Sequence, residues 1–176
     1  AEDGFVMVGI DYSQIELRMA AILSEDKKMI EIFNKGEDVH TGVAVRVFNV
    51  EPEEVTSEMR RKAKVINFGI LYGMGVNALR TNLGEDTTRE EAQEFLNAYF
   101  NTFTRLAEYL EETKQFARDH GYTKTLFGRQ RHFPGIKSHA PFIRAQAERM
   151  AINASIQGTA ADVMRLSMSH VFDYLK

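Results

Sequence analysis

One segment, Arg60–Gly73, limits the possible structures of this chain more than any other part of the sequence. Four of its side chains follow one another at intervals of four residues: Arg60, Lys64, Phe68 and Tyr72. A helix turns once in about 3.6 residues, so these four side chains, here called the stripe, lie along one slowly drifting line of a single helix. The stripe is cationic at one end and aromatic at the other. It would suit a ligand with a polyanionic end and a flat heterocycle, such as a nucleoside triphosphate.

A solvated, charged helix face with Phe68 and Tyr72 buried would produce the same spacing. Gly69 favours the ligand site, because glycine inside a helix costs roughly 1 kcal/mol relative to alanine and needs a reason to be there. A small residue beside Phe68 would allow a flat ligand to approach closely.

Composition excludes several classes of protein. With 176 residues and 44% hydrophobic residues, the chain is long enough for one domain with a core. It has no cysteine, which excludes disulfides and thiolate metal sites and is compatible with a reducing cytoplasm. The sequence has no signal peptide and no apolar run of about 18 residues, so it predicts neither export nor membrane spanning.

The formal net charge of −3 argues against bulk electrostatic binding to nucleic acid, but the charges are unevenly distributed. Between Gly121 and Asn153 there are six basic residues and one acid, whereas nine acids and four bases lie between Glu85 and Asp119. One face can therefore be basic although the whole chain is not.

Periodicity and capping residues predict a mostly helical chain with a small β component. A buried strand is expected at residues 5–11, followed by a helix from about 13 to 23. Asp26, Asp38 and the capping box of Thr88 and Glu91 each predict a helix start. The remaining expectations are helices over about 56–72, 76–83 and 104–120, and a hairpin over 122–133. The region 140–176 is also helical but interrupted near Gln157–Thr159, so it is expected to form two consecutive helices or one bent helix.

Three motifs resemble the family A DNA polymerases, the bacterial DNA polymerase I type. Arg60–Gly73, with its Arg-x-x-x-Lys-x-x-x-Phe-x-x-x-Tyr-Gly pattern, is similar to the family's fingers helix, and Asp11–Arg18 to its first palm motif. The region Thr125–Val163 also follows the family's pattern. The resemblance runs from about Phe5 to the C-terminus. It implies an α+β fold made of the fingers helices and part of the palm, and a two-metal transfer of nucleotides from dNTPs to a primer 3′-hydroxyl in DNA replication and repair.

The resemblance also implies an organisation in three parts. Residues 1–25 would be a palm segment, 26–121 the fingers, and 122–176 a hairpin and helices returning to the palm. The family's His-Asp-Glu palm hairpin does not occur in the sequence, so we expect a fragment that is inactive alone. The parent would be a monomeric, cytoplasmic, nucleoid-associated bacterial enzyme that binds a DNA primer–template and dNTPs. The alternative is a stand-alone nucleotide- or DNA-binding module without catalysis.

Asp11 and Glu16 are the candidate acidic site residues. An aspartate at a strand end is more often a cap, and a helix glutamate an ordinary surface carboxylate. The resemblance implies instead that Asp11, with the backbone carbonyl of Tyr12, binds the two Mg²⁺ ions of the full-length enzyme. It implies that Glu16 is a steric gate against the ribose 2′-hydroxyl, with Gln14 as a weaker nucleotide contact.

The other nucleotide and DNA contacts also come from the resemblance. Arg60 and His40 would bind the triphosphate, although a lone histidine is more often a surface or half-buried residue. Lys64 would also contact the triphosphate and give a proton to the leaving pyrophosphate. Phe68 would stack near the incoming sugar and base, and Tyr72 would occupy the template-stacking site until the fingers close.

A second set of donors lies on the C-terminal helix: Arg149, Asn153 and Gln157, again at intervals of four residues. Every base pair presents acceptors in the minor groove, so donors placed there can test the shape of a pair without reading its sequence. A polar helix face is the alternative interpretation. Asp162, by contrast, is expected to be structural.

Overall fold

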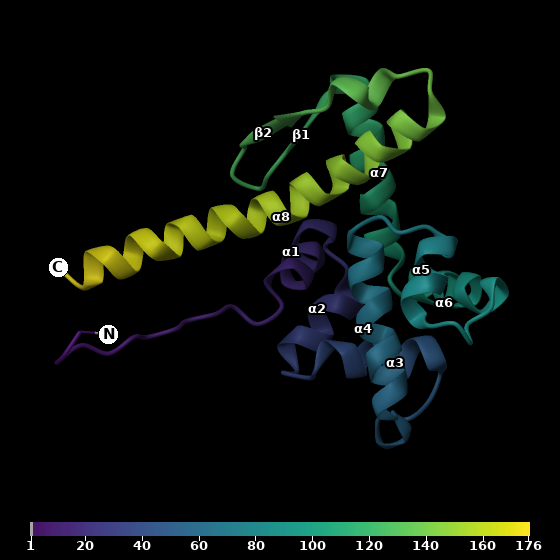
Figure 1. Cartoon of the computed structure of the whole chain (residues 1–176), viewed down its shortest axis with the longest axis horizontal. Coiled ribbons are helices and arrows are strands. Elements are labelled where there is room, and N and C mark those ends of the chain that lie inside the picture. Colours follow the sequence, from purple (N-terminus) through teal and green to yellow (C-terminus); the bar gives the residue numbers. More distant parts are fainter. Residues whose placement is uncertain (1) are drawn as a thin grey trace.

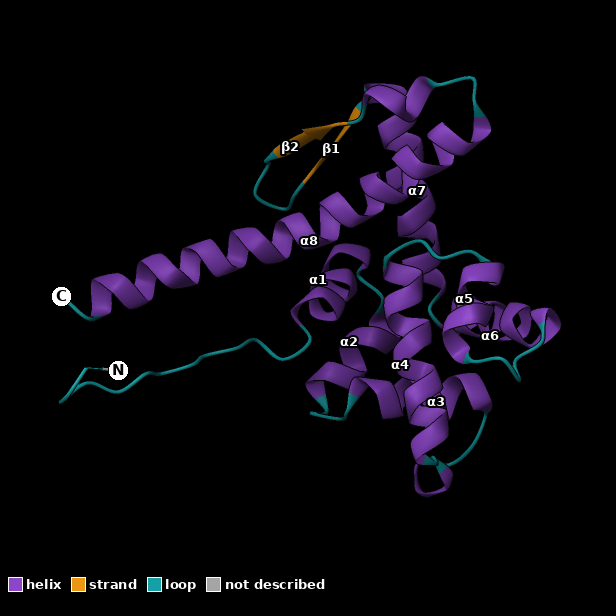
Figure 2. Ribbon diagram, viewed as in Figure 1, coloured by secondary structure: helices purple, strands orange, loops and turns teal. Residues whose placement is uncertain are grey.

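The computed structural model describes residues 2–176, which form a mostly helical fold with one two-stranded sheet (Figures 1 and 2). The α-helices are α1 (Ile15–Ser24), α2 (Lys27–Asn34), α3 (Val39–Phe48), α4 (Ser57–Leu71), α5 (Val76–Leu83), α6 (Arg89–Thr102), α7 (Thr104–His120) and α8 (Pro141–Tyr174). The strands are β1 (Tyr122–Lys124) and β2 (Gln130–His132), and short 3-10 helices lie at η1 (Pro52–Glu54) and η2 (Pro134–Lys137). The predicted fold class is confirmed.

Helix α4 lies at the centre of the cluster formed by α1 to α6 (Figure 1). The Thr56 side chain caps its N-terminus by accepting from the Met59 N–H. At its C-terminus Gly73 adopts φ 67°, and the Met74 N–H donates to the Gly69 carbonyl at 2.8 Å, as in a Schellman motif. The predicted helix over 56–72 is confirmed to within one residue at each end.

The other capping predictions are confirmed as well. Asp26 accepts from two backbone N–H groups at the start of α2, and Asp38 accepts from the Thr41 N–H at the start of α3. Thr88 and Glu91 form the predicted capping box of α6. These caps act within one turn of chain, which explains why the sequence alone located them.

The main core is formed by buried side chains of α1 to α7, together with Ile152, Ile156 and Ala160 of α8. Tyr99 and Phe103, at the α6–α7 junction, are its largest fully buried side chains. A second, smaller cluster lies under the hairpin and contains Ala117, Phe133 and Ile136 together with alanines of α8. Among residues 2–176, no helix has the length and apolarity needed to cross a bilayer.

The predicted buried strand at residues 5–11 is wrong. This segment has no regular secondary structure and is exposed, with Phe5 at 72% and Met7 at 88% exposure. It runs as an extended loop alongside the C-terminal half of α8 (Figure 2). A strand needs a neighbour to accept and donate its backbone hydrogen bonds, and the sheet of the described residues contains only β1 and β2.

Of the two alternatives predicted for the region near Gln157–Thr159, two consecutive helices are wrong, because α8 continues through these residues as one helix (Figure 1). Glycine disfavours the helix interior, which is why the sequence predicts an interruption at Gly158. In the structure Gly158 is a packing residue: an added Cβ would lie 2.7 Å from the Thr125 Cγ2 atom. Glycine here lets the hairpin approach the helix closely.

The predicted hairpin is confirmed, and polar contacts hold its loop against α8. Strands β1 and β2 pair antiparallel, with Thr123 opposite Arg131. The Arg129 guanidinium donates to Asp162 at 2.8 Å and to the Gly158 carbonyl at 2.9 Å. This ion pair supports the expectation that Asp162 is structural.

Candidate functional site

The stripe on α4 is accessible from the surface along its whole length. Arg60 and Lys64 are exposed, and Phe68 and Tyr72 are half-buried. The two rings are nearly parallel, at an interplanar angle of 15° and a centroid separation of 6.3 Å. The alternative in which both rings are buried is therefore wrong, and a ligand could reach the cationic and aromatic ends together.

Asp38 connects the first turn of α3 to the stripe. Its two carboxylate oxygens each accept a hydrogen bond from the Arg60 guanidinium, at 2.9 Å. Burial alone would raise the pKa of Asp38, but the hydrogen bonds from Arg60 and Thr41 lower it to about 2. The pair holds the Arg60 side chain at the N-terminus of α3, where unpaired N–H groups and the helix dipole also favour an anion.

His40 lies beside this pair, in the first turn of α3. Its ring is 5.8 Å from the Phe68 ring, and Nδ1 lies 3.2 Å from the Asn67 side-chain nitrogen. Burial lowers the pKa of His40, and the positive charges of Arg60 and Lys64 lower it further against the opposing effect of Asp38. His40 is therefore neutral at pH 7 and can act as a hydrogen-bond donor through one ring nitrogen.

At the aromatic end of the stripe, side chains from three helices converge. The Tyr72 hydroxyl donates to a Glu16 carboxylate oxygen at 2.9 Å, which joins α4 to α1. Burial and the Glu16 carboxylate raise the pKa of Tyr72, while a hydrogen bond with Gln157 of α8 opposes them. Gln14, at the N-terminus of α1, adopts a left-handed φ of 56° and is half-buried.

Helix α8 brings the remaining donors past the end of α4. An added Cβ at Gly73 would lie 2.7 Å from the Arg149 Cγ atom, so glycine is needed here for this close approach as well as for its positive φ. Arg149 and Gln157 are exposed, and the buried Oδ1 atom of Asn153 has no hydrogen-bond partner within residues 2–176.

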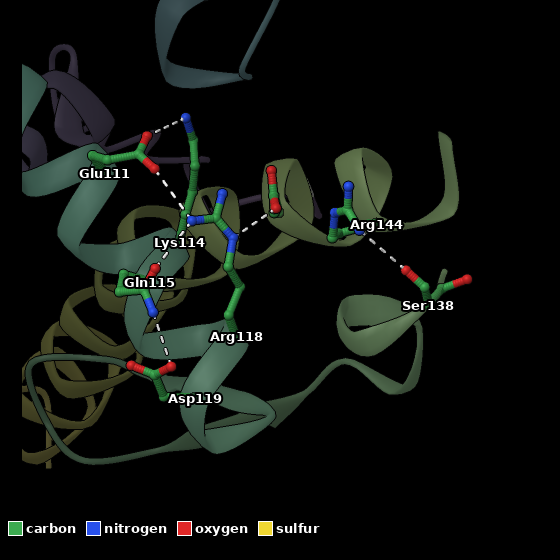
Figure 3. A network of polar contacts seen from close by, with 8 residues as sticks. Glu111, Lys114, Gln115, Arg118, Asp119, Ser138 and Arg144 are labelled. Atoms are coloured by element: carbon green, nitrogen blue, oxygen red, sulfur yellow. Dashed lines mark hydrogen bonds and ion pairs between the residues drawn. The ribbon is translucent and has the colours of Figure 1, made fainter. Parts of the chain in front are cut away.

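An ion pair between α7 and α8 fixes this part of α8. The Arg118 guanidinium donates to Glu148 at 2.9 Å, and it also contacts Gln115 and Glu111 on its own helix (Figure 3). Glu148 directly precedes Arg149 in the chain. The network therefore helps to set the position of Arg149.

Asp11, the predicted metal ligand, does not belong to a group of possible metal ligands, because among the described residues no group of three or more His, Cys, Asp or Glu residues could hold a metal ion. Asp11 and Tyr12 are exposed and border an apolar hollow of about 580 Å³ between the N-terminal segment and α8. The Tyr12 hydroxyl is hydrogen-bonded to Ser167 of α8, at 2.7 Å.

Sequence reasoning missed two residues that hold the predicted ones, Asn67 and Asp38. Asp38 was predicted as a helix cap but not as the partner of Arg60. Asn67 was not predicted at all, although a signal existed: it is a polar side chain on the face of α4 that is otherwise apolar, and a buried polar group requires a partner.

Comparisons with known proteins identify relatives of this chain. A family model described as "DNA polymerase family A" matches residues 1–176. DNA polymerase I of Caldicellulosiruptor bescii is 46% identical over 175 residues, which are 99% of this chain and 20% of that protein. The thermostable DNA polymerase I of Thermus aquaticus is 46% identical over 176 residues, which are 100% of this chain and 21% of that protein.

A solved structure also resembles this one. It is described as the POL domain of Pol1 from M. smegmatis in complex with DNA primer-template and dNTP. The TM-score is 0.88 at 42% sequence identity, over 94% of this chain and 29% of that one. Relative to the two DNA polymerase I proteins named above, this chain spans about a fifth of their length.

Proposed function

This chain belongs to DNA polymerase family A, and on that basis we propose that it forms the nucleotide-selecting part of a DNA-directed DNA polymerase. The reaction is the template-directed transfer of a nucleotide from a dNTP to a primer 3′-hydroxyl, in DNA replication and repair. Because the chain spans about a fifth of its relatives, the activity is proposed for a polymerase that contains these residues. Residues 1–176 alone are expected to be inactive.

The hydrogen bond between Tyr72 and Glu16 carries this proposal. The Glu16 carboxylate, the proposed gate, accepts from Tyr72, the last residue of the stripe. This contact supports a site in which Glu16 meets the sugar of a nucleotide whose triphosphate lies on Arg60 and Lys64. A nucleotide bound along α4 would then have its phosphates at Arg60 and Lys64, its sugar and base beside Phe68, and Glu16 near the sugar. We also propose the division into palm (1–25), fingers (26–121) and returning hairpin and helices (122–176), which follows from membership of the family.

The chemistry of the cationic end suits the transfer of a nucleotide. Arg60 offers a planar fork of N–H donors to phosphate oxygens, whereas Lys64 carries a mobile ammonium that can give a proton to the leaving pyrophosphate. His40 contributes a neutral donor at the N-terminus of α3. Phe68 stacks near the sugar and base, with Gln14 as a further contact.

On the DNA side, we propose that Arg149, Asn153 and Gln157 face the minor groove of the primer–template. Arg149 and Gln157 are exposed, and the contacts of α8 with Gly73 and Arg118 hold it next to the end of α4. Tyr72 would occupy the template-stacking position when no nucleotide is bound.

Asp11 and the Tyr12 carbonyl are hard oxygen donors of the kind that Mg²⁺ takes. They do not complete a site by themselves, because the described residues hold no group of three or more His, Cys, Asp or Glu side chains that could bind a metal ion. We therefore propose them as two donors of a site to which substrate phosphates and further carboxylates contribute. In such a site Mg²⁺ would supply stabilisation of the negative charge that develops at phosphorus.

The proposed substrates imply a setting for the parent enzyme. A polymerase that acts on chromosomal DNA in a bacterium works in the cytoplasm, in association with the nucleoid. The nucleotide site proposed here is built from a single chain, so a monomer is sufficient.

The central test uses a chimera in which residues 1–176 replace the matching segment of the Thermus aquaticus polymerase. Lys64→Ala should reduce the rate of nucleotide incorporation by about 100-fold or more, since a positioned general acid contributes a factor of that order. Arg60→Ala should raise the KM for dNTP. Duplex affinity should change little in either variant. Arg61→Ala is the matched control, because Arg61 pairs with Glu58 on its own helix.

Primer-extension kinetics and a duplex-binding titration separate the two effects. Unchanged incorporation by Lys64→Ala would remove the stripe from the mechanism. In the same chimera, Glu16→Ala should increase the ratio of ribonucleotide to deoxynucleotide incorporation, because the shorter side chain leaves room for the 2′-hydroxyl. A constant ratio would make Glu16 an ordinary helix carboxylate.

A binding module without catalysis is the competing function, and the chimera also tests it. If the chimera binds dNTP and duplex but extends no primer, this result supports the binding module without catalysis. Residues 1–176 alone should bind dNTP weakly and in a salt-dependent manner, more weakly still in Arg60→Ala, and should extend no primer. Extension by a preparation free of host polymerase would contradict the expected inactivity.

A further inference from the structure

His40 and Asn67 form a buried pair that ties α3 to α4. His40 is 4% exposed and Asn67 is fully buried. The Asn67 side-chain nitrogen lies 3.2 Å from Nδ1 of His40, across the interface where α3 packs directly against α4 (Figure 1). The pair is within the nucleotide site proposed above, so a role for it in nucleotide binding rests on that proposed function.

The chemistry of this contact determines where the histidine proton lies. A carboxamide nitrogen is only a donor, so the imidazole nitrogen that faces it must accept and carries no proton. A neutral imidazole then has its proton on Nε2. Burial and the neighbouring cations, Arg60 and Lys64, favour the neutral ring, while Asp38 is the one carboxylate that opposes them.

Nε2 is the free nitrogen of the ring. It has no hydrogen-bond partner within residues 2–176, yet it is not among the polar atoms sealed from solvent. The small exposed part of His40 therefore includes a donor that is ready for an acceptor from outside the chain. The stripe cations lie on the same helix pair, so that acceptor is expected to be an anion.

Stability does not account for Asn67. Its Oδ1 atom is buried without a hydrogen-bond partner within the described chain, and such an atom costs about 1–3 kcal/mol. An apolar side chain of similar size would avoid that cost while filling the same space. The amide therefore has a role that packing alone does not explain.

We propose that Asn67 is a positioning residue that holds His40 in the Nε2–H tautomer, so that the ring presents one neutral donor to an oxygen of the nucleotide triphosphate. Asn67 itself does not touch the ligand. It acts by removing the alternative tautomer, whose exposed nitrogen would be an acceptor and would repel a phosphate oxygen. The triphosphate thus meets two cations, Arg60 and Lys64, and one neutral hydrogen-bond donor, the Nε2–H group of His40. The tautomer that provides this donor is already present before the nucleotide binds.

The first experiment measures the tautomer directly in residues 1–176 by nitrogen-15 NMR of the histidine side chains at pH 7. His40 should show a protonated Nε2 and an unprotonated Nδ1. His120 is an internal reference with the opposite pattern, because its Nδ1 faces the Phe116 carbonyl at 2.9 Å and must donate. A His40 spectrum with the proton on Nδ1, or with both nitrogens protonated, would overturn the proposal.

Two variants then test the cause. Asn67→Leu should remove the tautomer preference and weaken dATP binding about tenfold, as expected for one lost hydrogen bond to a charged group, without lowering the unfolding temperature. Asn67→Asp should place the proton on Nδ1, because a carboxylate accepts, and should raise the pH at which His40 titrates. Asn101→Leu, an exposed asparagine of α6, is the control and should change neither property.

The outcomes for this proposal and for the proposed function are separable. If the wild-type chain binds no dATP, the nucleotide site fails, and the spectrum still decides whether Asn67 sets the tautomer. If Asn67→Leu keeps the Nε2–H tautomer and the affinity of the wild type, Asn67 is a packing residue and the positioning role is refuted.

Discussion

Replacing Asp38 by asparagine should destabilise the protein by removing one ion pair while keeping a helix cap. The carboxylate accepts from the Thr41 N–H at 2.9 Å and from the Thr41 hydroxyl at 2.8 Å, and it also pairs with Arg60. Asparagine caps helices about as well as aspartate, so Asp38→Asn keeps the cap and loses the charge together with one of the two oxygens that accept from Arg60. Asp38→Ala loses both functions.

The magnitude follows from the lowered pKa of Asp38. A change from 3.8 to about 2 corresponds to roughly 2.4 kcal/mol at about 1.36 kcal/mol per unit. The two side chains are 34% and 48% exposed, so water screens the pair and we expect about 1 kcal/mol instead. Asp38→Ala should cost about 2 kcal/mol, because the lost cap adds about 1 kcal/mol.

The pH dependence has a definite sign. The pKa of Asp38 is lower in the folded chain than in the unfolded chain, so its contribution is complete above about pH 4 and is lost as the pH falls towards 2. The difference in stability between the wild type and Asp38→Asn should therefore be constant from pH 7 to about 5. It should shrink between about pH 4 and 2.

Urea unfolding followed by the helical circular dichroism signal measures this difference at each pH. A double-mutant cycle with Arg60→Gln assigns it to the pair. The matched control cycle uses Arg61→Gln, which should show no coupling with Asp38→Asn, because the Arg61 guanidinium donates to Glu58 and to the Leu83 carbonyl and not to Asp38. Equal stability of Asp38→Asn and the wild type at pH 7, or a difference that persists at pH 2, would refute this reasoning.

Three further predictions test other contacts. Gly158→Ala should lower the unfolding temperature despite the better helix propensity of alanine, because its Cβ would meet the Thr125 methyl group, and Thr125→Ser should restore the loss; a more stable single variant would contradict the packing role. Tyr72→Phe in the polymerase chimera should relax discrimination against ribonucleotides, since Glu16 loses the hydroxyl that holds it; unchanged discrimination in primer extension would argue against this coupling. Arg118→Met should cost about 1–3 kcal/mol in urea unfolding by leaving a partly buried carboxylate of α8 unpaired, with helix content unchanged.

The sequence predicted most of the helices well because their signals are local. The caps at Thr56, Asp26 and Thr88 and the left-handed glycines at Gly73 and Gly121 each act within about one turn of chain. The two wrong predictions, the strand at residues 5–11 and the break between two helices at Gly158, concern features that depend on residues far away in the chain. Whether the segment 5–11 becomes a strand depends on a partner strand, and whether Gly158 breaks a helix depends on what packs against it.

The sequence by itself therefore determined that α4 is a helix and that its stripe carries two cations and two rings. Only the tertiary structure decided what each stripe residue contacts. Arg60 meets a carboxylate 22 positions away, and Tyr72 meets one 56 positions away. The physical reason is that such contacts depend on how helices pack, and packing is set by the shape of the whole core and not by any short run of residues.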